Sequence, residues 1–347
     1  MKQFLAKHKK ALLIGLPILT AGTIGTIFAV FLFSTPTFEW KFSTPEQQGM
    51  NPALIEDMLN YADSNGDTYS IIIIRNGYIV AERYLNGHEM NDRIDIWSVT
   101  KSFTSALVGI AVDRGYISVD DYILDFFPEL TIDNPSPEKD NMTIRHFLTM
   151  TTGLQQTVDH FDTNISNVLG MPMLYPPGEQ VLYHNGAPHT LQHILQKETG
   201  KSAYDFAIQN LFNPLAMKNY YWPTDTYGVP QGGFGLELRA RDMAKLGLLY
   251  LNNGTIQGKR ILSSDWIQAS ISPNMDLASV DDYGYFWWLG EEYYHAYGNR
   301  DQVIAVSPAN NLVAVFQSNN IFDHSFVMMQ NYVLPSIISS HTFNPSL

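Results

Sequence analysis

The chain has 347 residues and a formal net charge of −13, because 34 Asp and Glu residues outnumber 21 Lys and Arg residues. This acidic balance argues against nucleic acid as a partner, since neutralising phosphates requires clustered Lys and Arg. The sequence contains no cysteine, which excludes disulfides, a thiol nucleophile and a zinc–thiolate site. The apolar content of 45 % is typical of a globular protein with one large domain or two subdomains.

The chain opens with a basic segment and then a long uncharged one. Residues 1–10 carry four lysines, and residues 11–33 carry no charged side chain. At about 1.5 Å per helical residue, the uncharged segment spans about 34 Å, enough to cross a hydrocarbon core of about 30 Å. We therefore predict a transmembrane anchor at 11–33, with a cytoplasmic N-terminus and the remaining chain outside the cell membrane. A cleaved signal peptide and a buried helix are the alternatives.

The segment after this anchor predicts a linker and then a first group of elements. Residues 34–50 are rich in Pro, Ser and Thr and are expected to link the anchor to a domain over 51–347. Helical spacing that ends at a Gly predicts a helix over 52–66. Two β-branched and aromatic runs around Asn76-Gly77 predict a hairpin, and its run of four isoleucines indicates a strand buried on both faces.

The middle of the chain has helical periodicity, and strands return near the end. Apolar residues at i, i+3 and i+4 predict helices over 102–115, 142–154, 187–200, 202–212, 240–254 and 263–270. Short β-rich runs follow over 283–290, 292–298, 301–308 and 311–319, and a helix closes the chain over 324–340. We predict an α+β fold in which one antiparallel sheet joins the hairpin to the late strands. Helices flank this sheet, and a mainly helical lobe is inserted at roughly 98–275.

A Ser-x-x-Lys pair marks the start of the helical region. Ser98 and Lys101 would share one helix face, one turn apart. A lysine held away from water can be a neutral amine that takes the serine proton, and the helix N-terminus favours a developing oxyanion. An N-cap serine beside a solvated lysine explains the same spacing without any chemistry. The catalytic interpretation therefore depends on further residues elsewhere in the chain.

Two further motifs accompany this pair. Tyr183 and Asn185 form a Tyr-x-Asn sequence just before a predicted helix, where a tyrosine could shuttle a proton and an asparagine could hold a substrate carbonyl. Near the end of the chain, Ala296-Tyr297-Gly298 lies on a predicted strand, and its glycine would let the backbone approach a substrate closely.

With these motifs, the sequence resembles the serine β-lactamase and penicillin-binding superfamily, in its class C-like branch of esterases, D-amino-acid peptidases and 6-aminohexanoate-dimer hydrolases. The resemblance covers roughly residues 46–338 and extends to phrases outside the motifs, such as TIRHFLTMTTGL and GGFGLELRARDMAKLGLLYLNNG. It implies a β-lactamase/transpeptidase-like fold. It also implies that Ser98 is acylated, that Lys101 and Tyr183 move protons, and that Asn185 positions the substrate.

The resemblance further implies an oxyanion hole made by the backbone N–H of Ser98 and one just after Gly298, that of Asn299. The third motif departs from the family, which often has Lys-Thr-Gly or His-x-Gly where this chain has Ala296. The missing cation would normally hold a substrate carboxylate, so we expect ester or amide substrates without that group. Arg300 is a nearby candidate to replace it.

The resulting prediction is a serine hydrolase that needs no cofactor and acts on a small ester, amide or short peptide. A cell-wall or D-amino-acid peptidase is one alternative, and a ligand-binding or sensor module without turnover is another.

His189 and His193 have the spacing of two metal ligands, but no carboxylate or third histidine completes the set in the nearby sequence, so no metal site is predicted. These two histidines and His184 are expected to face solvent or to cap a helix. Asp225 is interpreted as a turn residue, with a place lining the cleft as the alternative. The sequence QGGFG at 231–235 is interpreted as a turn beside the site. The aromatic residues within 283–294 are expected mainly as sheet core, with one or two walling an apolar acyl pocket.

Overall fold

The computed structural model describes residues 37–157, 159, 161–273 and 282–338. The anchor expected at residues 11–33 lies outside these described residues. Within them, no helix combines the length and the apolar character needed to cross a bilayer.

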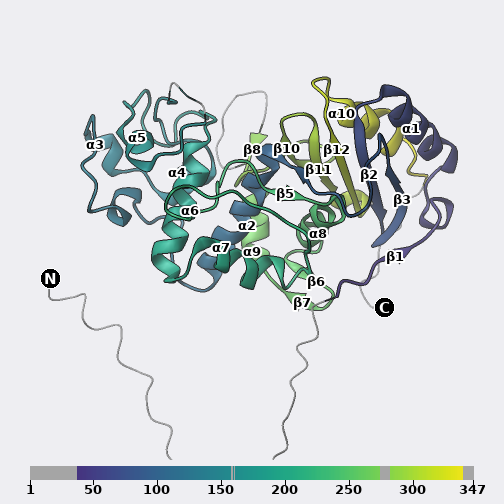
Figure 1. The fold of residues 1–347 in the computed structure, drawn as a ribbon, viewed down its shortest axis with the longest axis horizontal. Coiled ribbons are helices and arrows are strands. Elements are labelled where there is room, and N and C mark those ends of the chain that lie inside the picture. The colour runs from purple at the N-terminus through teal and green to yellow at the C-terminus, as the bar shows by residue number, and fades with distance from the viewer. Residues whose placement is uncertain (1–36, 158, 160, 274–281, 339–347) are drawn as a thin grey trace, which may run out of the picture. The chain divides into compact units, whose positions relative to one another are not determined.

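An eight-stranded sheet forms the centre of the described fold, in the order β1-β3-β2-β12-β11-β10-β9-β8 (Figure 1). Its strands are β1 (Lys41–Phe42), β2 (Thr68–Arg75), β3 (Tyr78–Tyr84), β8 (Asp282–Tyr283), β9 (Trp288–Leu289), β10 (Tyr294–Gly298), β11 (Gln302–Ser307) and β12 (Leu312–Ser318). Strand β2 of the first hairpin pairs with β12 in antiparallel register. The sequence-based expectation that the early hairpin and the late strands share one sheet is therefore confirmed.

The edge strand β1 differs from this antiparallel pattern. It pairs with β3 in parallel, with Lys41 opposite Tyr78. This strand falls within residues 34–50, for which we expected a linker. The same stretch ends at Met50, whose side chain is fully buried. From Lys41 onward, then, this stretch is part of the folded domain.

The helices follow the expected order with some differences in length. They are α1 (Pro52–Asn65), α2 (Thr100–Asp113), α3 (Pro137–Asp140), α4 (Ile144–Leu148), α5 (Ile165–Gly170), α6 (Gly186–Thr199), α7 (Ala203–Ala207), α8 (Ala240–Leu251), α9 (Ser264–Ser270) and α10 (His324–Met328). Single π-helical turns extend α7 over 208–212 and α10 over 329–333. Two short ladders, β4 (Ile94–Asp95) with β5 (Glu237–Leu238) and β6 (Thr255–Ile256) with β7 (Lys259–Arg260), complete the elements.

Two helices are shorter in the structure than the sequence predicts. The helix expected over 142–154 shortens to α4, because Met150 has a left-handed φ of 58° that no continuing helix adopts. The closing helix, expected to reach residue 340, ends its helical turns at Val333. Leu334 still has helical backbone angles, but Pro335 follows it and has no N–H to donate to the preceding turn, so the helical hydrogen-bond pattern stops here.

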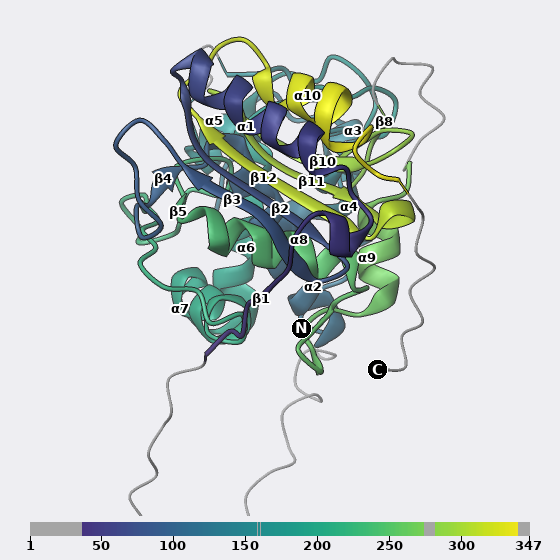
Figure 2. The ribbon, with the colours of Figure 1, turned by 90° about the vertical axis from the view of Figure 1, so that its right-hand side faces the viewer.

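Each face of the sheet is covered by helices, as Figure 2 shows with α1 and α10 on one side and α8 on the other. Alternating isoleucines of β2 serve the two cores: Ile71 and Ile73 pack in the cluster under α1, whereas Ile72 and Ile74 pack in the cluster that includes α2 and α8. All four are at most 1 % exposed. The prediction of a strand buried on both faces is confirmed.

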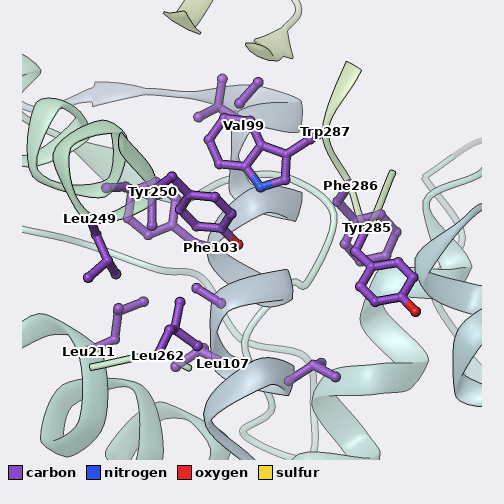
Figure 3. Close-up of a cluster of buried hydrophobic side chains, with 14 of the residues drawn as sticks. Val99, Phe103, Leu107, Leu211, Leu249, Tyr250, Leu262, Tyr285, Phe286 and Trp287 are labelled. Carbon is purple, nitrogen blue, oxygen red and sulfur yellow. The ribbon is translucent and has the colours of Figure 1, made fainter. Parts of the chain in front are cut away.

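Helix α2 runs through the larger of these cores. Figure 3 shows Val99, Phe103 and Leu107 along one side of it, beside Tyr250 of α8 and Trp287. These side chains are essentially inaccessible to solvent. Because large-to-small changes in such a core cost about 2–5 kcal/mol each, the position of α2 is firmly fixed. The residues at its N-terminus are thus held by a helix that is buried in the larger core.

Candidate active site

A sharp backbone turn delivers Ser98 to the start of α2. The chain leaves β4, makes one 3-10 turn over Trp97–Val99 and enters the helix. Trp97 has a φ of 47°, and its backbone N–H donates to Asp95 Oδ1 at 2.8 Å, which holds the turn. A bulky residue rarely adopts this conformation, and such strain is concentrated at functional sites. The Ser98 side chain is left partly exposed beside the free end of the helix.

Lys101 lies one turn further along and is only 1 % exposed. Its Nζ donates to Asn185 Oδ1 at 2.8 Å and to the Gly233 carbonyl at 2.7 Å, and lies 3.0 Å from Ser98 Oγ. Burial holds the pKa of this lysine well below its usual value. A neutral amine has two N–H bonds and one lone pair. The two amide oxygens take the N–H bonds, which leaves the lone pair for the Ser98 hydroxyl proton.

Tyr183 closes the site on the other side of Lys101. Its ring centre is 4.7 Å from Lys101 Nζ. Burial raises the pKa of Tyr183 to about 12, and a hydrogen bond with Ser98 opposes part of this rise. The ring is stacked on Trp288 with 6.0 Å between centroids and meets Tyr283 edge-on at 6.4 Å. These contacts hold a protonated phenol next to the serine hydroxyl.

Asn185 and Gly233 hold Lys101 from the helical lobe. Asn185 is the residue directly before α6, so the first turn of that helix fixes its backbone. Gly233 belongs to the QGGFG sequence, which we interpreted as a turn beside the site, and its carbonyl contacts Lys101 as described. A Cβ on Gly233 would meet the carbonyl of Asn185 at 3.2 Å, so the glycine permits this close approach.

The end of β10 meets the start of α2. A Cβ on Gly298 would lie 2.3 Å from the Ile96 carbonyl and 3.1 Å from the Ser98 nitrogen. Only glycine allows the strand to approach the serine backbone so closely. Asn299 follows on an exposed turn, where its Oδ1 accepts a hydrogen bond from the Arg300 N–H at 2.9 Å. The structure therefore gathers Ser98, Lys101, Tyr183, Asn185 and Gly298 in one place, with Asn299 adjoining.

A comparison with protein-family models agrees with this arrangement. The beta-lactamase family model matches residues 62–331, more than three quarters of the chain. The chain belongs to the beta-lactamase family. Its recognised relatives include the 6-aminohexanoate-dimer hydrolase of Paenarthrobacter ureafaciens, which is 22 % identical over 252 residues, covering 62 % of this chain and 60 % of that protein. A protein of Alkalihalophilus pseudofirmus is 25 % identical over 296 residues, covering 72 % of this chain and 83 % of its own.

Solved structures show the same fold. A 6-aminohexanoate-dimer hydrolase-like protein of Bacillus anthracis superposes with a TM-score of 0.68 at 24 % identity, covering 80 % of each chain. EstCE1, described as a hydrolase with promiscuous acyltransferase activity, also gives 0.68, at 14 % identity over 81 % of this chain and 98 % of its own. The α+β architecture expected from the sequence is confirmed by these neighbours.

At the third motif, strand β10 carries Ala296 where the family often has a cationic residue. Ala296 is 1 % exposed and lies on the same face of β10 as Gly298, so its methyl group belongs to the core. Arg300 is exposed, and its guanidinium lies 5.4 Å from the ring centre of Trp97. The structure thus carries a cation beside the residue that precedes Ser98, although it comes from a turn rather than from the strand.

The histidines near Tyr183 differ from expectation. We expected them at the surface or capping a helix, whereas His184 is 8 % exposed and His189 is inaccessible. Burial and the neighbouring Lys101 lower the pKa of His184 to about 4. The fold also brings Asp225 within 3.1 Å of His189 Nε2 and 2.7 Å of His193 Nε2. The sequence argument considered only the residues near the histidine pair in the chain, whereas Asp225 is distant in sequence but adjacent in space, so the fold adds a carboxylate to the pair.

Several residues at the site had no signal in the sequence. The Gly233 carbonyl is a main-chain group, and nothing in QGGFG shows that it faces Lys101. Trp288 and Tyr283 were expected mainly as sheet core, with one or two such aromatics walling an acyl pocket, and they pack against Tyr183. Asp225 does form the predicted turn, since its Oδ1 accepts the Tyr227 and Val229 N–H groups at 2.8 and 2.9 Å.

Proposed function

We propose that this protein is a serine hydrolase that cleaves an ester or amide bond through an acyl-enzyme on Ser98. The observation that carries the proposal is the environment of Lys101: two carbonyl-type acceptors take its N–H bonds and its third contact is the Ser98 hydroxyl. A serine becomes nucleophilic only when a positioned base removes its proton. This pairing supplies such a base.

The reaction follows from the positions of the surrounding groups. Ser98 Oγ attacks the substrate carbonyl as Lys101 takes its proton, and the oxyanion forms between the N–H groups of Ser98 and Asn299. Tyr183, protonated at neutral pH, passes a proton to the leaving alcohol or amine. Water then attacks the acyl-enzyme, the same groups return the proton, and the acid leaves with Ser98 restored. Side chains and backbone supply every step, so no cofactor is required.

The substrate class follows from the third motif. The buried Ala296 offers no charge to a substrate carboxylate, and the aromatic side chains of Trp288 and Tyr283 favour an apolar acyl group. We therefore propose small neutral esters or amides as the principal substrates. Arg300 above Trp97 favours a second candidate, a peptidase that binds a terminal carboxylate. An Arg300→Gln variant should lose activity only on carboxylate-bearing substrates if that second candidate is correct.

We also propose that residues 11–33 anchor the chain in the cell membrane, with residues 51–347 on the outer side. The support is the uncharged 11–33 segment after a lysine-rich start. Protease added to intact cells should remove the domain while the basic N-terminus stays protected. Release of the domain into the medium without protease would instead indicate a cleaved signal peptide.

A fluorophosphonate probe tests the hydrolase proposal directly. The full-length chain in mild detergent should be labelled covalently, the Ser98→Ala variant should not, and the Lys101→Met variant should react far more slowly. Ser105→Ala is the matched control, because Ser105 is a buried serine on the same helix, two turns away. A folded wild-type chain that the probe leaves unlabelled would contradict the proposal, as would labelling that survives in Ser98→Ala.

A further inference from the structure

The cluster of His189, His193 and Asp225 plays no part in the proposed hydrolysis. His189 and His193 are four residues apart on α6, so their side chains lie on one face of that helix. Asp225 comes from the loop that packs across this face. All three ligand atoms lie within 4.8 Å of one another. We propose that these three side chains bind one zinc-class divalent transition-metal ion.

The distances fit such an ion. In a tetrahedral zinc site with bonds of about 2.0–2.1 Å, neighbouring ligand atoms are about 3.3 Å apart. Both imidazole Nε2 atoms approach the same oxygen, Asp225 Oδ2, at 3.1 and 2.7 Å. Both of these distances are close to that value, and all three ligand atoms lie within 4.8 Å of one another. Two imidazoles and one carboxylate suit zinc and its neighbours, whereas magnesium and calcium prefer oxygen ligands alone.

The surrounding contacts orient these ligands as a metal site requires. Asp225 Oδ1 accepts two backbone N–H groups, which fixes the carboxylate and leaves Oδ2 for the ion. His189 Nδ1 lies 3.2 Å from the Pro230 carbonyl, a closer partner than the Gly232 N–H at 3.4 Å. An imidazole that donates from Nδ1 to a backbone carbonyl presents the lone pair of Nε2, the usual arrangement for a metal-bound histidine. The Gly232 N–H donates to the same Nδ1 in the other tautomer, in which Nε2 donates to Asp225 Oδ2. Metal binding would select the tautomer protonated at Nδ1, whose Nε2 lone pair would face the ion.

The burial and charge of the cluster also suit a divalent ion. The side chain of His189 is 1 % exposed, while those of His193 and Asp225 are 14 % and 16 % exposed. The last two line a cavity of about 530 Å³, so the remaining coordination position would face water. Lys197 lines the same cavity, but its Nζ is paired with Glu129. The charges of that pair cancel, which leaves Asp225 as the uncompensated anion beside the ion.

A metal here would fasten the loop that holds Lys101. The loop runs from Asp225 through Pro230, which contacts His189, to Gly233, whose carbonyl accepts from Lys101. Thr104 of α2 also donates to the Gly232 carbonyl at 2.8 Å. The ion would therefore act as a structural clamp between α6 and this loop. Its binding does not depend on the hydrolase proposal and is measured separately from it.

Calorimetric titration of the full-length chain, free of any affinity tag and stripped with a chelator, tests the site. Zinc chloride should bind with one equivalent per chain, and cobalt(II) should give the visible absorption of a four-coordinate nitrogen and oxygen site. The ion should raise the melting temperature by several degrees. Losing a group that only hydrogen-bonds to a metal ligand weakens metal binding by about 10- to 100-fold. His193→Gln and Asp225→Asn each remove a ligand itself, so each should weaken zinc binding by more than that.

His88→Gln is the matched control, because His88 also pairs with an aspartate, Asp92, four residues along, but at the surface. This variant should bind zinc as the wild type does. Absence of saturable binding in the wild type, or unchanged affinity in both His193→Gln and Asp225→Asn, would overturn the proposal. The cobalt(II) spectrum of the wild type tests the site without any variant. The weak absorption of six-coordinate, octahedral cobalt(II) would count against the proposal.

Discussion

At the scale of single residues, Lys101 is the group on which the proposed chemistry depends. Its burial disfavours the ammonium form and lowers its pKa well below the ordinary lysine value, and the free amine that this favours can accept the Ser98 proton. Tyr183 is perturbed in the opposite sense, since burial keeps it protonated to about pH 12. Two neighbouring groups with their pKa values pushed in opposite directions, one down and one up, form a base and an acid at the same pH.

A pH profile of probe labelling follows from these shifts. The second-order rate of fluorophosphonate labelling should rise with pH as Lys101 loses its proton, with a midpoint well below the ordinary lysine value, and then level off. Asn185→Asp places a carboxylate where an amide oxygen now accepts from Lys101 Nζ at 2.8 Å. This anion stabilises the ammonium form, so the rising limb should move up by about one pH unit or more.

The plateau rate at high pH should largely recover in Asn185→Asp, because the variant changes the proton affinity of Lys101 and leaves Ser98 in place. If the pH midpoint of labelling in Asn185→Asp equals that of the wild type, a group other than Lys101 acts as the base.

Gly298 controls the approach of β10 to Ser98. In Gly298→Ala the new methyl group would meet the Ile96 carbonyl at 2.3 Å, so the strand end must move away from the Ser98 N–H. We expect the labelling rate to fall by about 10²- to 10³-fold, the effect of losing one oxyanion donor. Asn299→Ala is the control, because it removes a side chain but keeps the backbone N–H. A large loss in that control would assign the role to the side chain instead.

The sequence predicts residues at this scale only when the signal is local. Ser98 with Lys101, and Tyr183 with Asn185, each lie within one helical turn or one short motif, so their types and spacing were sufficient. The Gly233 carbonyl, Trp288 and Asp225 reach their partners through the fold. No spacing rule relates Asp225 to His193, because helix α7 lies between them in the chain and the loop that follows it, before β5, folds back on α6 with turn hydrogen bonds of its own.

At the scale of elements, helix α2 connects the site to the core. It begins at the strained turn before Ser98 and runs past Gly109, where a Cβ would lie 2.4 Å from Trp266 Nε1 of α9. The glycine is therefore required by the close approach of the two helices. The long amphipathic helices α1 and α6 were predicted within one residue at each end, and α8 within three residues at its C-terminal end. The shorter α4 was overestimated, because left-handed Met150 ends a pattern that continues in the sequence.

Replacing this glycine tests the packing of α2. Alanine in mid-helix gains about 1 kcal/mol of intrinsic helix stability, but overpacking a full core costs about 1–3 kcal/mol. Because the Trp266 indole is buried and packs against Tyr285 with 5.2 Å between ring centroids, we expect Gly109→Ala to destabilise the fold by about 1–2 kcal/mol in denaturant unfolding. The five-membered ring of Trp266 makes the close contacts. The double variant with Trp266→Phe should therefore show a favourable coupling energy, and additive effects would contradict this packing.

At the scale of the whole described domain, the two helical layers and the sheet between them bury several histidines. His184 lies beside Lys101, and His295 lies on β10 between Tyr293 and Phe326, with ring centroids 5.6 and 5.1 Å away. Burial lowers the pKa of His184 and of His295 to about 4. Within the described residues, His295 Nδ1 has no hydrogen-bond partner, and the loss of hydration is what lowers the pKa of this partly buried ring. The fold thus keeps both histidines neutral.

Acid should therefore weaken the fold between about pH 6.5 and pH 4. In this window the unfolded chain binds a proton at each histidine and the folded chain does not, so stability falls as the pH falls. For His295 the loss from pH 7 to pH 4.5 should be on the order of 2 kcal/mol, at about 1.4 kcal/mol per pKa unit. His295→Leu fits the aromatic surroundings and removes the titrating ring. Urea unfolding of both proteins at the two pH values measures the difference. The wild type should lose about 2 kcal/mol more than His295→Leu, and equal losses would show that His295 is protonated in the folded state as easily as in the unfolded one.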